Sequence, residues 1–550
     1  MWKPGWRNEA WSELTRLFDL IVIGGGITGA GIFREASRAG LRVLLVEAND
    51  FASGSSSRSA KLVHGGLRYL ANLDFKLTLE SVRERERLLK QGQGLVMPIG
   101  FFFTDYAGDW PPGWLFGGGL VAYDLLALRW RHRHIPLAEV RQRFPYLRVN
   151  RLQGGYHYFD AQTDDARLVL RVIEEGQRDG CIALNYARVE TLLSDREGEV
   201  CGVAISDRDP GGIGRTAEVR ARCIINATGC WTDELRSQVG GRRRLRKLRG
   251  SHLLFSAARI PLTEVVGFIH PRDHRPMYTF PWEGATLLGT TDIDHTLQPS
   301  GPETDPALDL AEVDYLMEAA DDIFPDLKLG EDDILATFSG IRPVIDTGQI
   351  NPSKESRDMV LWNERGLLTV TGGKLTTFRL MAHQALRAVR KHLPGKPEFN
   401  ESTRVLDCQP GEVDLPVDLA GERRQRMIGR YGNRVELVFS GSRAADLTSI
   451  GGAESCWAEL RWSAQNEAVI HLDDLLLRRQ RIGLTLPRGG LDQIGAVRAI
   501  AQSALGWDDV RWENEQAAYR ALIGKSYSVP GRSYEEVHSP RRCICPEISS

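Results

Sequence analysis

The most constraining feature of this sequence is a glycine-rich turn between two short apolar segments near the N-terminus. A β-branched and aliphatic run that begins at Asp19 ends in Gly24-Gly-Gly26-Ile-Thr-Gly29, and a helical stretch and a second apolar run follow before Glu47. In such a unit Gly24 permits a tight turn, Gly26 lets the backbone approach a pyrophosphate, and Gly29 lets helix and strand pack closely. An acid about 20 residues further on accepts ribose hydroxyls. The pattern predicts a Rossmann-type α/β domain that binds a dinucleotide.

The kind of dinucleotide follows from Glu47 and from the loop after it. A carboxylate at this position would repel a 2′-phosphate, so FAD and NAD are favoured over NADP. A nicotinamide enzyme would continue with further β-α units, whereas residues 49–69 form a polar loop rich in serine and glycine. Such small residues can wrap the pyrophosphate and ribityl chain of FAD. A flexible linker is disfavoured, because aliphatic residues and an Arg-Tyr pair are embedded in the loop.

Two segments far from this loop in the sequence also combine a short apolar strand with a turn that contains glycine and threonine. Residues 223–229 and 367–377 each contain an apolar strand that ends in threonine and glycine, and the second segment opens a helix that reaches about Lys391. Parallel sheets bind ligands at the carboxyl ends of their strands, so both turns are expected beside the cofactor. The positive end of the helix would there stabilise negative charge on a reduced flavin.

Composition narrows the class of protein. A chain of 550 residues corresponds to about two to four domains, and Lys+Arg 70 against Asp+Glu 72 does not favour nucleic-acid binding. The 8 cysteines are scattered, without a disulfide framework or zinc spacing, so a reducing compartment and no metal site are expected. Because no apolar run is long enough for a secretory signal or a spanning helix, we expect a cytoplasmic protein.

Taken together, the motifs form a signature. In chain order they are Gly24-Gly-Gly-Ile-Thr-Gly-Ala-Gly31, Ser59-Ala-Lys-Leu-Val-His-Gly-Gly-Leu-Arg-Tyr69, Asn226-Ala-Thr-Gly229, Arg249-Gly-Ser-His252, Gly289-Thr-Thr-Asp292, Ser339-Gly-Ile-Arg-Pro343 and Gly372-Gly-Lys-Leu-Thr-Thr377. This order resembles the FAD-dependent, aerobic, quinone-linked glycerol-3-phosphate dehydrogenases. The resemblance covers residues 19–390 strongly and continues more thinly through 430–433 and 472–481.

The resemblance implies a fold and a reaction. The fold is a Rossmann-type FAD-binding domain of the glutathione-reductase/D-amino-acid-oxidase type with an interleaved substrate domain, plus a C-terminal helical domain. The reaction is FAD-dependent oxidation of sn-glycerol 3-phosphate to dihydroxyacetone phosphate by hydride transfer to flavin N5, with electrons passed to a membrane quinone. The alternatives are a glycerol-3-phosphate oxidase that uses oxygen and a related FAD-dependent amine or hydroxy-acid oxidoreductase. The oligomeric state stays open, with a homodimer as one candidate.

The expected substrate site combines residues of separate motifs. Arg68, Arg342 and Lys374 offer two guanidinium groups and an ammonium group that suit a phosphate, and Tyr69 offers a phenolic donor. His252 matches the family's active-site histidine and is the candidate base, because an imidazole exchanges a proton near neutral pH. The predicted catalytic residues are His252, Arg342 and Arg68, and the predicted substrate-binding residues are Arg68, Tyr69, His252, Arg342 and Lys374.

The cofactor is expected to contact residues from all the loops described above. His64 either touches the flavin or holds its loop in place. The predicted cofactor-binding residues are Gly24, Gly26, Gly29, Glu47, Ser56, Ser57, Lys61, Leu62, His64, Gly66, Thr228, Gly229, Gly373, Lys374, Leu375 and Thr376.

We divide the chain into an oxidoreductase domain, 19–400, and a C-terminal α-helical domain, 411–535. The FAD-binding segments are about 19–97, 156–248 and 336–400, and the substrate segments are about 98–155 and 249–335. A proline-containing polar stretch supports the boundary before the C-terminal domain. Within that domain the basic run Arg478-Arg479-Gln480-Arg481 is interpreted as a solvated face.

Two parts of the sequence have the composition of a membrane contact. Residues 110–116 and 130–134 combine aromatic anchors with cations, and residues 242–249 are densely cationic. The alternatives are an aromatic lining of the substrate part and a cationic funnel for phosphate. Since a quinone dissolves in the bilayer, we expect peripheral attachment to the inner face of the cell membrane.

Overall fold

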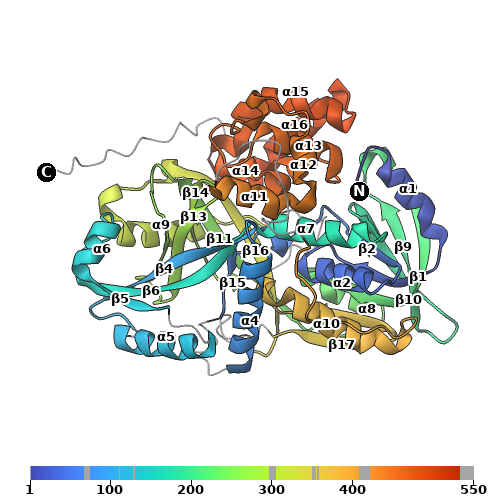
Figure 1. Cartoon of the computed structure of the whole chain (residues 1–550), viewed down its shortest axis with the longest axis horizontal. Helices are drawn as coiled ribbons and strands as arrows, with labels where there is room; N and C mark the ends of the chain where they lie inside the picture. The colour runs from blue at the N-terminus through green and yellow to red at the C-terminus, as the bar shows by residue number, and fades with distance from the viewer. Residues whose placement is uncertain are drawn as a thin grey trace.

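The computed structural model describes residues 2–66, 75–110, 112–127, 131–212, 214–295, 305–349, 355, 358–407 and 421–532. Two β-sheets lie side by side, and the C-terminal helices lie over the junction between them (Figure 1). Arg68, Tyr69 and Trp130 lie outside the described residues.

The first sheet contains the nucleotide-binding motif. Its strands run in the order β17-β18-β10-β1-β2-β7, and β1 is parallel to β2 and β10. Leu20 and Val22 of β1 face one apolar core, while Ile21 and Ile23 face another, so the strand is buried on both sides. The strands are β1 (Phe18–Ile23), β2 (Val43–Val46), β7 (Ile182–Leu184), β8 (Ala187–Ser194), β9 (Val200–Asp207), β10 (Thr216–Asn226), β17 (Val360–Glu364) and β18 (Leu367–Thr371).

Three helices pack together in the first of those cores: α2 (Ile27–Arg38), α7 (Asp165–Arg178) and α10 (Phe378–Val389). Helix α2 begins inside the glycine motif, because Gly26 is its N-cap. The expected helix after Gly373 is α10, which starts at Phe378 after one 3-10 turn, Leu375–Thr377. A short helix, α8 (Thr232–Ser237), follows β10.

The second sheet has ten strands and is mostly antiparallel. The boundaries expected near residues 156 and 336 fall inside two of its strands, β6 and β16. Its strands are β3 (Leu62–Val63), β4 (Val96–Tyr106), β5 (Arg133–Pro136), β6 (Leu152–Thr163), β11 (Leu245–Ser256), β12 (Val265–Ile269), β13 (Pro276–Trp282), β14 (Ala285–Gly289), β15 (Ile293–Asp294) and β16 (Ile334–Ile345). The helices around it are α4 (Phe75–Gln91), α5 (Gly113–Ala127), α6 (Leu137–Arg143) and α9 (Leu310–Ile323).

The C-terminal part is helical and shares an apolar core with the second sheet. Its α-helices are α11 (Gly421–Tyr431), α12 (Val435–Phe439), α13 (Trp457–Asn466), α14 (Ile482–Thr485), α15 (Ile494–Leu505) and α16 (Asp509–Ser526). A π-helical segment, Asp474–Arg479, carries Leu475 and Leu476 into this core.

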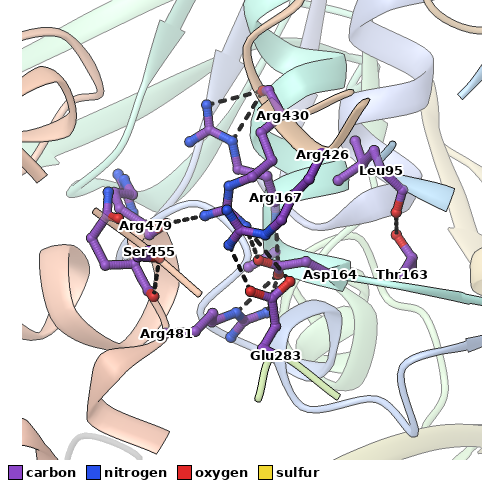
Figure 2. A network of polar contacts seen from close by, with 12 residues as sticks. Leu95, Thr163, Asp164, Arg167, Glu283, Arg426, Arg430, Ser455, Arg479 and Arg481 are labelled. Atoms are coloured by element: carbon purple, nitrogen blue, oxygen red, sulfur yellow. Dashed lines mark hydrogen bonds and ion pairs between the residues drawn. The ribbon is translucent and has the colours of Figure 1, made fainter. Parts of the chain in front are cut away.

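The interpretation of residues 478–481 as a solvated face is wrong. Arg478, Arg479 and Arg481 are at most 3% exposed and form ion pairs with carboxylates of the first domain, among them Asp50 and Asp164. Figure 2 shows Arg430 and Arg481 converging on Asp164. Charge runs are usually solvated, but here acidic partners far away in the sequence allow the arginines to be buried.

The tryptophan-rich N-terminus packs against the first sheet. Trp2 is 2% exposed and donates a hydrogen bond to the carbonyl of Ala183. Arg7, on α1 (Trp6–Ser12), pairs with Asp207 at 2.5 Å. Among the described helices, none has both the length and the apolar character needed to cross a membrane.

Candidate active site

A cavity of about 1490 Å³ lies where the carboxyl ends of β1, β10 and β18 face the second sheet. Its wall contains residues from every motif singled out in the sequence that the structure describes, except the Arg249–His252 segment. The predicted residues that line it are Gly24, Gly26, Glu47, Ser56, Leu62, His64, Thr228, Gly229, Arg342, Gly373, Lys374, Leu375 and Thr376.

One end of the cavity has the shape of a dinucleotide cradle. A Cβ atom on Gly29 would lie 1.9 Å from the carbonyl oxygen of Gly24, so only glycine allows α2 to approach the turn. Glu47 accepts a hydrogen bond from the backbone of Gly25 at 2.7 Å, and burial raises the pKa of this carboxyl. Ser56 accepts one from Ile27 at 3.0 Å. Bare backbone N–H groups and a hydroxyl group that can donate to a pyrophosphate, together with a carboxylate that can accept from ribose hydroxyls, fit FAD.

Five predicted residues in the described part of the chain do not line the cavity: Gly29, Ser57, Lys61, Gly66 and His252. Gly29 acts through packing, as described. The ammonium group of Lys61 is buried against Asp165 at 2.9 Å and also donates to the carbonyl of Ser57, and burial lowers the pKa of Lys61 to about 8. The cofactor-binding role expected for Lys61 and Ser57 stays a prediction.

His252 lies beside the cavity wall on β11, between β14 and β16. Its ring stacks on Phe338 with centroids 4.6 Å apart. It also lies against Gly289, the cross-strand partner of His252, where an added Cβ would be 2.2 Å from Cδ2 of His252. The residue is 1% exposed, and neither imidazole nitrogen has a hydrogen-bond partner among the described residues. Burial, followed by the charges of Arg342 and Lys61, lowers the pKa of His252 well below its ordinary value.

The cations of the site lie on different elements. Arg342, on β16, donates to the carbonyl of Thr291 at 3.2 Å, to Asp292 at 3.2 Å and to the hydroxyl of Thr290 at 3.0 Å. Lys374, at the turn after β18, lies 3.5 Å from the hydroxyl of Ser81. Both line the cavity, so two separate motifs bring positive charge to it.

Sequence reasoning missed the glycines that make room for these side chains. A Cβ on Gly250 would lie 2.3 Å from the guanidinium nitrogens of Arg342, as Gly289 makes room for His252. Both glycines occur in the quoted motifs, so the signal was a small residue on a strand next to a functional side chain. Asp160, which also lines the cavity, was missed as well; it accepts from the backbone of Gly65 at 3.1 Å, and burial raises the pKa of Asp160 to about 6.

The other end of the cavity is apolar. Phe101, Phe103, Phe116, Tyr158 and Tyr278 line it, and the rings of Phe103 and Phe116 stack 4.5 Å apart. Helix α5 forms one wall with Gly118 and Gly119, at which a Cβ would meet nothing within 4 Å. The sequence offered an aromatic lining only as an alternative to membrane contact.

The mouth of this apolar end is exposed. Trp114 and Phe75 line the cavity and are 75% and 52% exposed, respectively. Helix α5 is therefore apolar both toward the cavity and toward the outside, an arrangement that soluble proteins seldom leave uncovered.

The cationic run at residues 242–249 has ion pairs in its second half, whereas Arg242, Arg243 and Arg244 are exposed. Arg246 pairs with Asp294 at 2.6 Å, and Arg249 pairs with Glu312 at 2.7 Å. Among the described residues there is also no cluster of histidine, cysteine and carboxylate side chains suited to a metal ion.

Comparison with known proteins gives two matching families. "FAD dependent oxidoreductase" matches residues 19–379, and "C-terminal domain of alpha-glycerophosphate oxidase" matches residues 373–512. The predicted fold class and the prediction of FAD are confirmed by these matches and by the solved structure described next.

Individual relatives cover nearly the whole chain. Glycerol-3-phosphate dehydrogenase 2 of Mycobacterium tuberculosis is 33% identical over 94% of this chain and 90% of its own. An aerobic glycerol-3-phosphate dehydrogenase of Staphylococcus epidermidis is 34% identical over 84% of this chain and 86% of its own. The X-ray structure of the Bacillus halodurans glycerol-3-phosphate dehydrogenase complexed with FAD superposes with a TM-score of 0.74 at 26% identity, covering 95% of this chain and 98% of that one.

Proposed function

The chain belongs to the FAD-dependent glycerol-3-phosphate dehydrogenase family, and from this we propose that it oxidises sn-glycerol 3-phosphate to dihydroxyacetone phosphate and passes the electrons to a quinone at the membrane surface. When bound, FAD supplies the acceptor for the hydride that leaves C2 of the substrate. The protein must bind the phosphate, orient the C2 hydroxyl group and take its proton.

The observation that carries the reaction is a buried base beside a cationic wall. Because His252 has no hydrogen-bond partner among the described residues and a lowered pKa, its imidazole is neutral at physiological pH and has a lone pair ready to accept the hydroxyl proton. Arg342 and Lys374 provide the fixed charges that a near-dianionic phosphate requires, with Arg68 and Tyr69 expected to complete the set.

The two binding functions are assigned to different sheets. We assign FAD binding to the first sheet and its glycine turns, and substrate binding to β11, β14 and β16 of the second sheet. The phosphate-directed cations argue against an amine as the substrate.

A quinone acceptor is supported by the apolar end of the cavity. A lipid-dissolved ring needs an apolar entrance that can face a bilayer, and Phe75 and Trp114 form such an entrance. Oxygen needs no such entrance. Trp110, which is 72% exposed, extends the apolar surface beside α5, so we propose that this face attaches the protein peripherally to the membrane.

Anaerobic mixing tests the proposal. Glycerol 3-phosphate should bleach the flavin absorbance of the purified protein, whereas glycerol and unrelated amines should not. The bleached protein is then mixed with a quinone analogue or with oxygen in separate experiments. Faster return of the absorbance with the quinone analogue supports a dehydrogenase, and equal or faster return with oxygen replaces it by an oxidase.

A further inference from the structure

Lys61 is a buried cation for which the proposed reaction gives no use. Its ammonium group is 0% exposed, pairs with Asp165, and lies 4.7 Å from the ring centroid of Phe338 and 5.2 Å from that of Trp282. Removing an ammonium group from water costs free energy, which the ion pair with Asp165 and the two cation–π contacts offset only in part, and an apolar side chain of the same length would fill the space without that cost. The positive charge therefore indicates a function that requires a cation at this place.

Phe338 connects this cation to the candidate base. Phe338 on β16 is the cross-strand partner of His252 on β11, and the two rings stack at an interplanar angle of 17°. One aromatic ring thus contacts both the ammonium group of Lys61 and the imidazole of His252. No other aromatic ring is stacked on His252 in the described part of the chain.

We propose that Lys61 is a positioning residue for His252: its buried ammonium group, fixed behind Phe338 by Asp165, keeps the imidazole in the neutral form that accepts the substrate's proton. The inference rests on the proposed role of His252 as the base. A nearby cation in a poorly solvated site disfavours the imidazolium form. Lys61 itself stays charged at neutral pH, since its pKa is about 8.

Lys61 differs from Arg342, the other cation that acts on His252, in one respect. Arg342 lines the cavity, so a bound phosphate would offset its charge when the base is needed. Lys61 does not line the cavity, so the substrate cannot neutralise it. The charged groups around His252 are Arg342 on β16, Lys61 before β3 with Asp165 and Arg481 behind it, and Glu312 on α9, which accepts a hydrogen bond from the neighbouring Ser251 at 2.8 Å.

The C-terminal domain holds this arrangement in place. Arg481 pairs with Asp164 (Figure 2). It also pairs with Asp165 and donates to the carbonyl of Ser57 at 3.4 Å. Asp165 in turn accepts from the backbone and the hydroxyl of Ser59 at 3.0 and 2.7 Å. The loop from Ser57 to Lys61 is therefore fixed by an arginine of the C-terminal domain as well as by its own contacts with Asp165.

The test measures the pH dependence of anaerobic flavin bleaching at saturating glycerol 3-phosphate. Lys61→Met and Lys61→Gln remove the charge, and Gln keeps a donor for Asp165 in case Met does not fold. Lys61→Arg is the control that keeps the charge. FAD content and melting temperature are measured for each variant.

We expect the acid limb of the profile to move to higher pH by about one unit in Lys61→Met and Lys61→Gln, the size expected for loss of a cation across one aromatic ring. Lys61→Arg should keep the wild-type limb, and KM should change little in all three variants because Lys61 does not line the cavity.

His252→Asn separates this inference from the proposed role of the base. If His252→Asn bleaches slowly and loses the acid limb while the neutral Lys61 variants keep the wild-type limb at full FAD content, only the inference about Lys61 is overturned. If the flavin of His252→Asn bleaches at the wild-type rate, His252 is not the base, and the inference about Lys61 is overturned together with that role. A shifted limb in the neutral variants, absent in Lys61→Arg, supports the inference.

Discussion

Gly289 and His252 are directly opposite each other on β14 and β11, and the imidazole ring lies so close to the glycine that a Cβ there would be 2.2 Å from its Cδ2 atom. The missing side chain of Gly289 creates the space that the base occupies. The missing side chain of Gly250 likewise makes space for Arg342, which lies two positions along on the neighbouring strand β16. Two glycines on neighbouring strands thus let a base and a cation lie flat against the sheet at one wall.

Gly289→Ala should displace His252 and slow flavin bleaching by roughly 10²-fold or more, within the range expected for loss of a general base. FAD content should stay normal, because Gly289 belongs to the second sheet. Gly330→Ala is the matched control, since a Cβ there meets nothing within 4 Å. A normal bleaching rate in Gly289→Ala would show that the position of His252 does not limit the reaction.

Gly26→Val should remove FAD. A Cβ at this position already lies 3.1 Å from the hydroxyl of Ser56, and the branched methyl groups would occupy the space where the backbone must approach the pyrophosphate. The measurement is the ratio of flavin to protein absorbance after purification. Gly495→Ala, on α15 with open space around it, is the control. Full flavin content in Gly26→Val would contradict the position of the cradle.

Arg342→Ala should weaken binding of glycerol 3-phosphate by about 2–5 kcal/mol, the usual cost of breaking a charge pair at a binding site. Binding of unphosphorylated glycerol should change much less. Titration of the oxidised flavin spectrum with each ligand gives both values, and Arg342→Lys tests how much of the effect is charge alone. Equal losses for the two ligands would place Arg342 away from the phosphate.

The stability of the C-terminal domain should depend on pH through His471. Burial lowers the pKa of His471, but its hydrogen bond to Glu515, at 2.9 Å, and the charges of Asp474, Glu515 and Asp473 together outweigh burial and raise the pKa to about 9. A pKa raised in the folded state stabilises the protein fully below the unfolded value of about 6.5, and the stabilisation is lost as the pH rises through about 9.

Comparison of the wild type with His471→Gln isolates this contribution. The difference in free energy of unfolding should be about 3 kcal/mol near pH 6 and should fall toward zero above pH 9. Urea unfolding across this pH range measures it. A difference that stays constant with pH would show that His471 is not protonated in the folded protein.

Trp110→Gln with Trp114→Gln should weaken binding to anionic lipid vesicles, because these exposed rings are the apolar anchors of the α5 face. The wild type should then resist release by salt better than the double variant, since a purely electrostatic contact is screened within about 10 Å at 0.1 M salt. Val510→Gln, at a residue 70% exposed on the distant α16, is the control. Unchanged vesicle flotation of the double variant would remove α5 from the membrane contact.

The sequence was most informative where local chemistry determines structure. The turn from Gly24 to Gly29 and the strands around it could be predicted because a tight turn, a close helix and two buried strands each demand particular residues nearby. The burial of Arg478, Arg479 and Arg481 could not, because besides the nearby Asp473 and Asp474 that pair with Arg478 it depends on Asp50, Asp164 and Asp165, which lie far away in the sequence. A run of arginines by itself carries no sign of its partners.

The site was predictable in part for the same reason. One cavity is lined by Glu47, Arg342 and Lys374. Each of these residues belongs to a strand or turn whose local sequence pattern determines its place. That Lys61 faces Asp165 and Phe338 could not be read from its motif, since the motif specifies the loop but not the helix and the strand that pack behind it.

The ion pair of Asp165 with Arg481 also bears on how the protein is made. The two residues are separated by 316 positions, and Asp50 and Arg479 by 429. At about 5–20 residues per second, a ribosome needs roughly 15 to 60 s to reach Arg481 after it has added Asp165. Until then Asp165 has Lys61 and Ser59 as partners but not Arg481, so the loop from Ser57 to Lys61 lacks the contribution of the C-terminal arginine. A chain that stops before Arg481 would keep the whole glycine turn and still lack the contacts of this arginine with Asp165 and with the carbonyl of Ser57, so part of what fixes the cofactor loop is synthesised 424 residues after Ser57.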